Sequence, residues 1–306
     1  MITVAVDGGQ SSLRLKILPD GVTGWGPGYV HGRNGVQAIV DAVRRAADQA
    51  GLDGRPVAIA TLGLTGYPGD AAARQTLANG LARVLHANEV RLCGDMVTAH
   101  AGALPAGYGV VVAAGTGTVC LAVDRDGSWH QVDGHGYLFG DAGSAFAIGR
   151  AGIVAAQRAR DGRATVTTLA EVSASPAKLY TSTTVVADVA RFAPVVLRCA
   201  ALGDIVAQGI VAGAVADLAE TISTGVRALR GTDRVPVACV GGLFAAGEQL
   251  LGPLRSALDS RALLTPPAGA SLDGAQRLTD GEARQYAGLI DVYHFDADPT
   301  STSREP

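Results

Sequence analysis

The order of apolar and polar positions in the first part of the chain predicts a β-hairpin followed by alternating helices and strands. Residues 2–7 form an apolar run typical of a strand, and residues 13–18 alternate apolar and basic side chains as a half-buried strand does. The Gly8–Ser12 segment between them predicts the hairpin turn. The elements expected next are a glycine- and proline-rich loop at 21–35, a helix ending before Gly51, a strand at 57–64, a helix at 71–85, a strand at 89–93 and a short helix at 95–104.

After Pro105 the same order of elements begins again. The expected elements are strands at 109–114, 119–124 and 129–132, a long amphipathic helix whose apolar face runs from Val211 to Leu229, a strand at 235–240, a glycine turn at 241–242, a helix at 244–251 that stops before Gly252-Pro253, and a frayed tail at 300–306. The second half therefore resembles a second copy of the first in pattern more than in identity, and the fold class is α/β.

Composition limits the kinds of ligand and compartment. The 306 residues suffice for two domains, and the 48% hydrophobic content and 41 glycines indicate a globular chain with several tight loops. The net charge of -3 and the lack of a basic run argue against nucleic acid or an anionic membrane surface as the main partner. The N-terminal segment lacks the features of a signal peptide and no transmembrane helix is expected, so we expect a cytoplasmic protein.

The four cysteines are far apart in the sequence. Cys93, Cys120, Cys199 and Cys239 show neither the CxxC nor the Cys/His spacing of a zinc site, and they suggest no disulfide framework. We interpret them as buried reduced thiols.

The first candidate binding loop is Asp7-Gly8-Gly9-Gln10-Ser11-Ser12. A glycine pair between two strands permits positive φ, so that successive backbone N–H groups can point at a phosphate. A plain hairpin turn is the alternative. Asp7 favours the binding interpretation because a carboxylate at the end of a buried strand is well placed to hold the water shell of Mg²⁺.

A second loop, Gly115-Thr116-Gly117-Thr118, repeats this arrangement at the start of the second half. A strand followed by Gly241-Gly242 completes a set that predicts a nucleotide clamp. Neither loop has the G-x-x-x-x-G-K-[ST] pattern, and no G-x-G-x-x-G opens a helix after the first strand. P-loop and Rossmann nucleotide binding are therefore disfavoured.

These motifs together resemble the actin, Hsp70 and sugar kinase superfamily, and within it the BadF/BadG/BcrA/BcrD-type branch that contains N-acetylglucosamine kinases. The resemblance runs from Ile2 to about Gln276. The motifs that carry it are Asp7-Gly8-Gly9-Gln10-Ser11, Gly63-Leu64-Thr65-Gly66, Gly94-Asp95-Met96, Gly115-Thr116-Gly117-Thr118, Gly136–Ser144 and Val240-Gly241-Gly242. It implies a two-lobed actin-like ATPase fold with an interdomain cleft, a first lobe at 1–105 joined by a C-terminal helix at about 279–290, a second lobe at 106–278, and a homodimer.

The resemblance also assigns roles. Gly8, Gly9, Gln10, Ser11 and Ser12 with Gly115, Thr116, Gly117 and Thr118 would bind the phosphates of ATP, Gly241 and Gly242 the adenosine, and Asn34, Thr65, Gly66, Asp95, His135 and Asp141 the sugar. Asp95 would be the catalytic base that accepts the proton of the attacking hydroxyl, with Mg²⁺ near Asp7. For Asp95, Asp141 and Asn34 the alternative is a helix N-cap, and for His135 a surface position.

We expect the substrate to be glucosamine, phosphorylated at its 6-hydroxyl, with N-acetylglucosamine as the alternative. The motif Gln131–Gly136 resembles that of actinobacterial glucosamine kinases, and the carboxylates Asp133 and Asp141 would suit an ammonium group at C2. Two departures from the family are Ser12, where relatives often have Lys, and Ala142, where many have Glu. Rivals from other classes are an ATP-driven activator of acyl-CoA dehydratases, which needs exposed cysteine ligands for an iron–sulfur cluster, and a non-enzymatic nucleotide-binding regulator.

Overall fold

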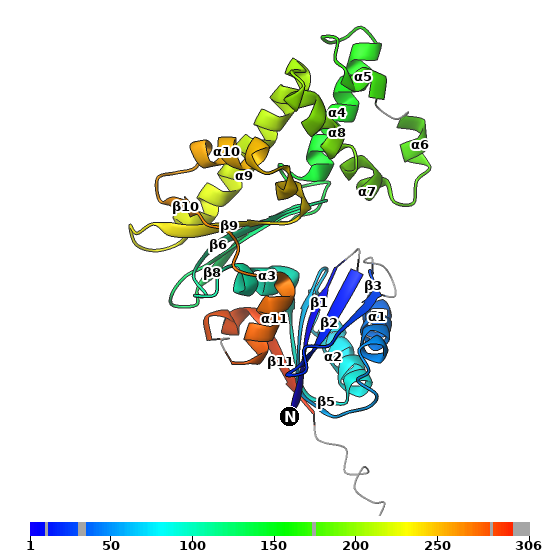
Figure 1. Cartoon of the computed structure of the whole chain (residues 1–306), viewed down its shortest axis with the longest axis vertical. Helices are drawn as coiled ribbons and strands as arrows, with labels where there is room; N and C mark the ends of the chain where they lie inside the picture. Colours follow the sequence, from blue (N-terminus) through cyan, green and yellow to red (C-terminus); the bar gives the residue numbers. More distant parts are fainter. Residues whose placement is uncertain (10–11, 30–34, 173–175, 282–283, 296–306) are drawn as a thin grey trace, which may run out of the picture. The chain divides into compact units, whose positions relative to one another are not determined.

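In the computed structural model the chain forms two compact units. The first comprises Met1–Gly107, Arg125–Ser128 and the residues from Ala268 onward, and the second comprises Tyr108–Asp124 and Trp129–Pro267. The structure describes all residues except 10–11, 30–34, 173–175, 282–283 and 296–306 (Figure 1). Each unit has its own sheet and its own hydrophobic core.

The first unit is built on a six-stranded mixed sheet in the order β11-β5-β4-β1-β2-β3. Its strands are β1 (Ile2–Gly8), β2 (Ser12–Leu18), β3 (Thr23–Pro27), β4 (Val57–Leu64), β5 (Ala87–Gly94) and β11 (Asp291–His294). Helices α1 (Gly35–Gln49) and α2 (Ala71–Leu85) pack on one face, where Val4 and Val6 of β1 are fully buried. Helices α3 (Asp95–Ala103) and α11 (Ser271–Thr279) pack on the other face, toward which Ala5 points.

The second unit is built on a five-stranded sheet in the order β10-β9-β6-β7-β8. Its strands are β6 (Gly109–Ala114), β7 (Thr118–Val123), β8 (Trp129–Asp133), β9 (Val235–Val240) and β10 (Ala262–Leu264). Its helices are α4 (Ala145–Arg160), α5 (Leu169–Val172), α6 (Pro176–Tyr180), α7 (Val185–Ala190), α8 (Ala193–Ala201), α9 (Ile205–Ala228), the 3₁₀ helix η1 (Gly242–Ala246) and α10 (Glu248–Ala257).

The two sheets repeat one topology. In the first unit β1 pairs antiparallel with β2 and parallel with β4, and β4 pairs parallel with β5. In the second unit β6 pairs antiparallel with β7 and parallel with β9, and β9 pairs parallel with β10. The Gly8 turn and the Gly115 turn thus occupy equivalent positions, as do the ends of β4 and β9. The duplicated pattern expected from the sequence is confirmed.

The two units differ in the crossover between their third and fourth strands. In the first unit this crossover contains α1, whereas in the second it contains the helices from α4 to α9, which we call the helical insertion (Figure 1). Helix α9 is capped by Asp204, whose carboxylate accepts the N–H of Ala207 at 2.9 Å. By length and composition α9 could span a membrane, and its residues Leu218 and Ile222 are fully buried in the core of the second unit.

The expected loop at 21–35 contains a strand. In β3 the residues alternate between exposed positions and the buried glycines Gly24 and Gly26, which face α1. A Cβ atom on Gly24 would lie 1.9 Å from the carbonyl oxygen of Ala46, and one on Gly26 would lie 2.2 Å from that of Ala42. These glycines therefore permit close packing of a strand on a helix, which glycine content alone does not distinguish from a loop.

The elements near the end of the chain also differ from expectation. The helix expected at 244–251 is the short η1 followed by α10, which continues through Pro253 because Leu250 and Leu254 anchor it in the core. The chain returns to the first unit at Ala268, before the expected position near residue 279. The reason is that α11 belongs to the first unit and packs closely on α3, so that a Cβ on Gly274 would lie 1.8 Å from the carbonyl oxygen of Thr98. The stretch expected to be helical at about 279–290 contains the 3₁₀ helix η2 (Arg284–Leu289).

Candidate functional site

In the first unit the candidate residues lie at the carboxyl ends of three adjacent parallel strands. The register aligns Gly8 of β1 with Leu64 of β4, and Leu64 with Gly94 of β5. Thr65 and Asp95 directly follow these strands, so the strand order brings together side chains that are far apart in the sequence. Thr65 is tied to β1 by its N–H, which donates to the carbonyl oxygen of Gly8 at 2.8 Å.

Asp95 is the first residue of α3, and the N-cap position is taken by Gly94. Its Oδ2 accepts a hydrogen bond from the Thr65 hydroxyl. Burial raises the pKa of Asp95, the Thr65 hydrogen bond opposes this rise, and the negative charge of Asp7 adds to it. Asp95 is half-buried, and a carboxylate whose pKa is raised and whose hydroxyl partner orients it is suited to accept a proton.

Gly8 is required by close packing around the end of β1. A Cβ atom at this position would lie 2.7 Å from the Tyr29 hydroxyl and 2.9 Å from Cδ2 of Leu64. The turn that follows is closed by the N–H of Gly9, which donates to the carbonyl oxygen of Ser12 at 3.0 Å. Gln10 and Ser11, also expected in this loop, lie outside the described residues.

Tyr29 belongs to this site although sequence reasoning did not identify it. Its buried hydroxyl donates to the carbonyl oxygen of Gly8 at 2.9 Å. Burial raises its pKa, and the charges of Asp95 and Asp7 raise it further. No local pattern marks Tyr29, because it lies in an irregular segment and reaches the site only through the fold.

Asp7 is the residue expected to hold Mg²⁺. Its carboxylate, largely buried, forms an ion pair with Arg14 of β2, whose register position is directly opposite. Among the residues that the structure describes, no group of three or more His, Cys, Asp or Glu side chains could hold a metal. A single carboxylate fits Mg²⁺ held mainly through water and phosphate oxygens, and that ion would share Asp7 with Arg14.

In the second unit the Gly115–Thr118 loop is joined to the start of α4. The N–H of Ala145 donates to the carbonyl oxygen of Gly115 at 2.8 Å, and the N–H of Phe146 donates to that of Thr116 at 3.2 Å. These bonds use N–H groups that would otherwise be unsatisfied at the helix N-terminus. The loop is therefore held by the helical insertion as well as by β6 and β7.

Gly241 follows β9 and packs against the end of β6. Its φ of 102° lies in the region that favours glycine, and a Cβ there would lie 2.4 Å from the carbonyl oxygen of Ala114. Gly242 has no heavy atom within 4 Å of such a Cβ. The two glycines thus differ: the fold requires Gly241, whereas Gly242 leaves open space beside the loop.

Asp141 lies directly against the Gly115–Thr118 loop. Its Oδ1 accepts the N–H of Thr118 at 3.2 Å, and a Cβ on Gly117 would lie 2.7 Å from its Oδ2. Burial raises the pKa of Asp141, the Thr118 N–H opposes this, and Asp133 adds to the rise. Asp141 is not the N-cap of α4, since Ser144 accepts the N–H of Ala147 at 3.1 Å in that role.

Asp133 has a structural role that the sequence did not suggest. Its carboxylate accepts the N–H groups of Gly134, Asp141 and Ala142, each at 2.8 Å, and so closes the loop that carries Asp141. Both oxygens are used by backbone donors, so the expectation that Asp133 would bind an ammonium group is not supported. His135, within the same loop, is exposed.

The candidate residues fall into two sets, one in each unit. The described members in the first unit are Asp7, Gly8, Gly9, Ser12, Thr65, Gly66 and Asp95, and those in the second are Gly115, Thr116, Gly117, Thr118, His135, Asp141, Gly241 and Gly242. Asn34, Gln10 and Ser11 lie outside the described residues. Each set includes the turn between the first two strands of its unit and the end of the fourth strand in chain order, as the duplication implies. Asp95 follows β5, and His135 and Asp141 follow β8.

All four cysteines are free. Cys93, Cys120 and Cys199 are buried, and Cys239 is half-buried. Cys199 is packed in the core of the second unit. Burial raises the pKa of Cys120 to about 12, which is unfavourable for a thiolate ligand. The chain thus lacks the exposed cysteine needed for an iron–sulfur activator.

The chain is similar to known proteins over most of its length. The model of the BadF/BadG/BcrA/BcrD ATPase family matches residues 6–269. A structure from Chromobacterium violaceum, described as a candidate N-acetylglucosamine kinase, is 29% identical with a TM-score of 0.69, and the match covers 91% of this chain and 98% of that chain. No curated protein matches the chain.

Two more distant structures show the fold alone. One from Porphyromonas gingivalis, also described as a candidate N-acetylglucosamine kinase, is 17% identical with a TM-score of 0.69, over 91% of this chain and 99% of that chain. A ROK family glucokinase from Streptomyces griseus, in complex with glucose and AMPPNP, is 18% identical with a TM-score of 0.58, over 92% and 99%. The chain therefore has the α/β fold of two-domain sugar kinases of the actin-like ATPase class.

Proposed function

The chain belongs to the BadF/BadG/BcrA/BcrD ATPase family, and from this premise we propose that it is an ATP-dependent amino-sugar kinase that phosphorylates the 6-hydroxyl of glucosamine. The observation that carries the proposal is the half-buried Asp95, with its raised pKa and its hydrogen bond from Thr65, beside the turn at Gly8.

Asp95 would accept the proton of the sugar hydroxyl as that oxygen attacks the γ-phosphate. Thr65 would hold the carboxylate in place. Phosphoryl transfer needs little covalent help from the protein, so positioning and charge stabilisation would supply most of the rate enhancement. Thr65 and Gly66, which follow β4, would lie beside the bound sugar.

ATP would be held by the two equivalent turns. The Gly8–Ser12 and Gly115–Thr118 loops would bind its phosphates, and Gly241-Gly242 would bind the adenosine. In the second loop the N–H groups of Thr116 and Gly117 would bind phosphate, since those of Gly115 and Thr118 already donate to Gly117 and Asp141. The open space beside Gly242 supports the last assignment. Mg²⁺ near Asp7 would neutralise charge on the transferred group.

The preference for glucosamine rests on Asp141, since the carboxylate of Asp133 is used by the backbone. Asp141 has one oxygen bonded to the Thr118 N–H, which leaves the other able to accept from an ammonium group. His135 and Asn34 would complete the contacts with the sugar.

N-acetylglucosamine is the second candidate substrate, supported by the 29% identity to the Chromobacterium violaceum protein described as a candidate N-acetylglucosamine kinase. An acetamide is neutral, so it would gain less than an ammonium from a carboxylate partner. The two sugars differ only at C2, and a direct comparison of their turnover decides between them.

The deciding experiment measures ADP release from Mg-ATP with glucosamine, N-acetylglucosamine, glucose, mannosamine or buffer alone, for the wild type and Asp95→Asn. Glucosamine-dependent turnover that is lost in the variant supports the proposal. Equal or faster turnover of N-acetylglucosamine would overturn the proposed preference for glucosamine. The absence of any sugar-dependent turnover in the wild type would overturn the proposed kinase activity.

A further inference from the structure

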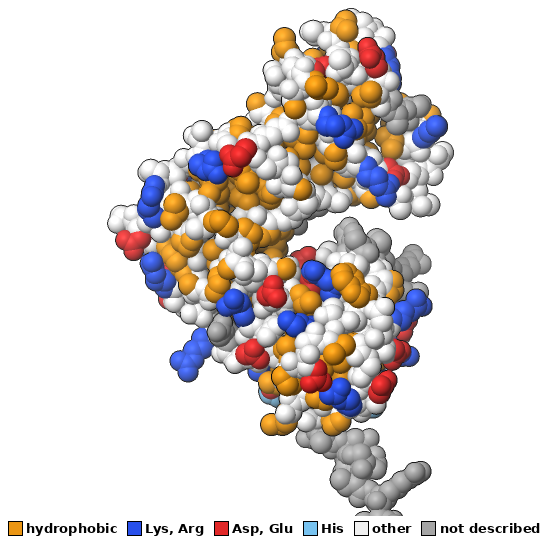
Figure 2. All heavy atoms as spheres, in the orientation of Figure 1, with side chains coloured by type: hydrophobic (Ala, Val, Ile, Leu, Met, Phe, Trp, Pro, Cys, Tyr) orange, Lys and Arg blue, Asp and Glu red, His pale blue; other side chains and the backbone are white. Residues whose placement is uncertain are grey.

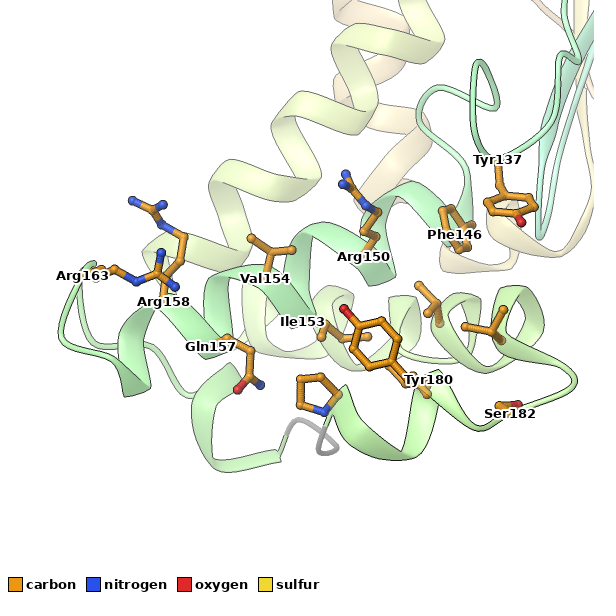
Figure 3. Close-up of a pocket in the computed structure, with 14 residues that line it drawn as sticks. Tyr137, Phe146, Arg150, Ile153, Val154, Gln157, Arg158, Arg163, Tyr180 and Ser182 are labelled. Carbon is orange, nitrogen blue, oxygen red and sulfur yellow. The ribbon is translucent and has the colours of Figure 1, made fainter.

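Two features of the structure lie outside the residues assigned to sugar and ATP. The first is a pocket of about 580 Å³ along α4 in the helical insertion, where Figure 2 shows hydrophobic side chains at the surface and Figure 3 shows the residues that line it. Its wall is mostly apolar, and nothing in the described structure shows what would cover it. The second is a cluster in the first unit formed by Tyr67, Arg74 and Asp291, which we call the clamp, and it is connected directly to the candidate site.

The three side chains of the clamp come from different elements and contact one another. The hydroxyl of Tyr67 donates to Oδ2 of Asp291, the first residue of β11. Arg74 of α2 forms an ion pair with the same oxygen, with its Nε 3.1 Å away, and its guanidinium carbon lies 5.8 Å from the centre of the Tyr67 ring. Burial raises the pKa of Tyr67, and the hydrogen bond to Asp291 raises it further, so the hydroxyl keeps its proton and remains a donor.

The clamp bridges the strand that leads into the proposed base. In the sheet β5 lies between β4 and β11, Tyr67 follows the end of β4, and Asp291 is paired with Leu92 of β5. The bond between Tyr67 and Asp291 therefore joins segments on opposite sides of β5. Burial raises the pKa of the Cys93 thiol in β5, and the charges of Asp95 and Asp291 raise it further, so both carboxylates lie near this strand end.

The clamp also fixes the backbone that follows Thr65 and Gly66. On the side before them, the N–H of Thr65 is bonded to β1. On the side after them, Nη1 of Arg74 donates to the carbonyl oxygens of Pro68 at 3.3 Å and Gly69 at 3.1 Å. Gly66 lies between these anchors with a φ of 68°, in the region that favours glycine. Because glycine adopts several backbone conformations at little cost, the geometry at Thr65 and Gly66 depends on both anchors.

We propose that the clamp positions Thr65 and Gly66 beside the bound sugar and, through the Thr65 hydroxyl, orients the carboxylate of Asp95. This inference rests on the proposed kinase function and adds β11, from the end of the chain, to the elements on which that function depends. Its three side chains are positioning residues, since they act through Thr65 and Gly66. A small displacement of a positioned group is costly in catalysis, because hydrogen bonds weaken steeply with distance and angle.

An NMR titration of carboxyl-labelled protein tests the proposal without turnover. Tyr67→Phe removes one hydroxyl and changes no charge, so a change in the pKa of Asp95 reports a change in geometry. We expect this pKa to be higher than in the wild type, in the direction expected for Thr65→Val, because the hydrogen bond that favours the charged carboxylate is weakened.

Tyr293→Phe is the matched control for this titration. Tyr293 lies in β11 two residues after Asp291, so the variant removes a tyrosine hydroxyl from the same strand and leaves the clamp in place. It should show the wild-type pKa of Asp95. The titratable groups that interact with Asp95 stay the same in both variants: Asp7, Tyr29 and Cys93. An unchanged pKa of Asp95 in Tyr67→Phe, with the protein folded by its thermal midpoint, would overturn the proposal.

Kinetics of variants at Asp291 test the effect on the sugar. Asp291→Leu removes the acceptor of the Tyr67 hydroxyl, whereas Asp291→Asn keeps an acceptor oxygen. We expect the KM for the sugar to rise about fivefold in Asp291→Leu and in Tyr67→Phe, and less in Asp291→Asn, with the KM for ATP unchanged. Equal rises in both KM values would indicate a general loss of structure and would overturn the positioning role. If the wild type turned over no sugar, the proposed function would fail, and the NMR titration alone would decide whether the clamp orients Asp95.

Discussion

The hydroxyl of Thr65 donates a 2.5 Å hydrogen bond to Oδ2 of Asp95, across the carboxyl ends of two adjacent parallel strands. The two residues are held there from opposite sides. On one side, the N–H of Thr65 donates to the carbonyl oxygen of Gly8. On the other, Asp95 is the first residue of α3, and this helix packs so closely on β4 that a Cβ on Gly63 would lie 2.2 Å from Oγ1 of Thr98. Thr65 is therefore a positioning residue for the proposed base, and its effects can be separated from those of Asp95.

Replacing Asp95 with asparagine is expected to remove activity without loss of stability. Turnover should fall by at least about 10²-fold, the usual contribution of a general base. Because the folded-state pKa of Asp95 is raised, wild-type stability falls as pH rises from the ordinary aspartate range through the raised pKa. Asp95→Asn lacks that loss, so at pH 7 its thermal midpoint should equal or exceed the wild type's. A lower midpoint would contradict the pKa direction.

Thr65→Val and Asp7→Asn are expected to move the pKa of Asp95 in opposite directions. The valine removes a hydrogen bond that favours the charged carboxylate, so the pKa rises further, while the asparagine removes a neighbouring negative charge, so it falls. The check is an NMR titration of carboxyl-labelled protein, which reports the pKa without needing turnover. In the kinetics, the acidic limb of kcat/KM for Thr65→Val should shift to higher pH. Shifts of the same sign in both variants would contradict this assignment.

Gly241→Ala and Gly242→Ala form a matched pair. The first places a methyl group against the carbonyl oxygen of Ala114 in a backbone region that disfavours alanine, and it should destabilise the second unit by about 1–3 kcal/mol. The second meets open space, so its unfolding free energy should change by less than about 0.5 kcal/mol. Chemical denaturation measures both. Although Gly242→Ala should be as stable as the wild type, it should bind ATP more weakly than the wild type if Gly242 borders the adenosine.

Asp133→Asn tests the closure of the loop that carries Asp141. Asparagine has one acceptor oxygen, so at least one of the three backbone N–H groups loses its partner, at a cost of about 1–3 kcal/mol. The KM for the sugar should rise more than kcat falls, because the variant displaces Asp141 and leaves Asp95 in place. Asp259→Asn, which alters a carboxylate bonded to the N–H of Arg261 in an exposed turn, is the control. An unchanged KM in Asp133→Asn would show that the loop does not depend on this carboxylate.

The elements that local patterning predicted well are those whose reasons are local. The first two strands, the strands at 109–114 and 235–240 and the glycine turns between them follow from apolar periodicity and from the backbone freedom of glycine, and the structure contains them. The sequence also predicted the position of Asp95 between a strand and a helix, because the apolar run of β5, the polar Asp95 and the helical pattern of α3 follow one another directly in the sequence. The equivalence of the two halves followed from the repeated order of these elements.

Other features depended on contacts between distant segments. The sequence predicted a loop where β3 lies, because the glycines of β3 are there to allow close packing against α1 and carry no apolar pattern. The short strands β10 and β11 are defined only by the neighbouring strands with which they pair. Tyr29 joins the site through a hydrogen bond to Gly8, and Asp133 proved to be a backbone anchor. The type of a side chain predicts which groups it can bind. Its actual hydrogen-bond partners are decided by the tertiary structure, because buried donors and acceptors must bond with the groups that the fold places beside them.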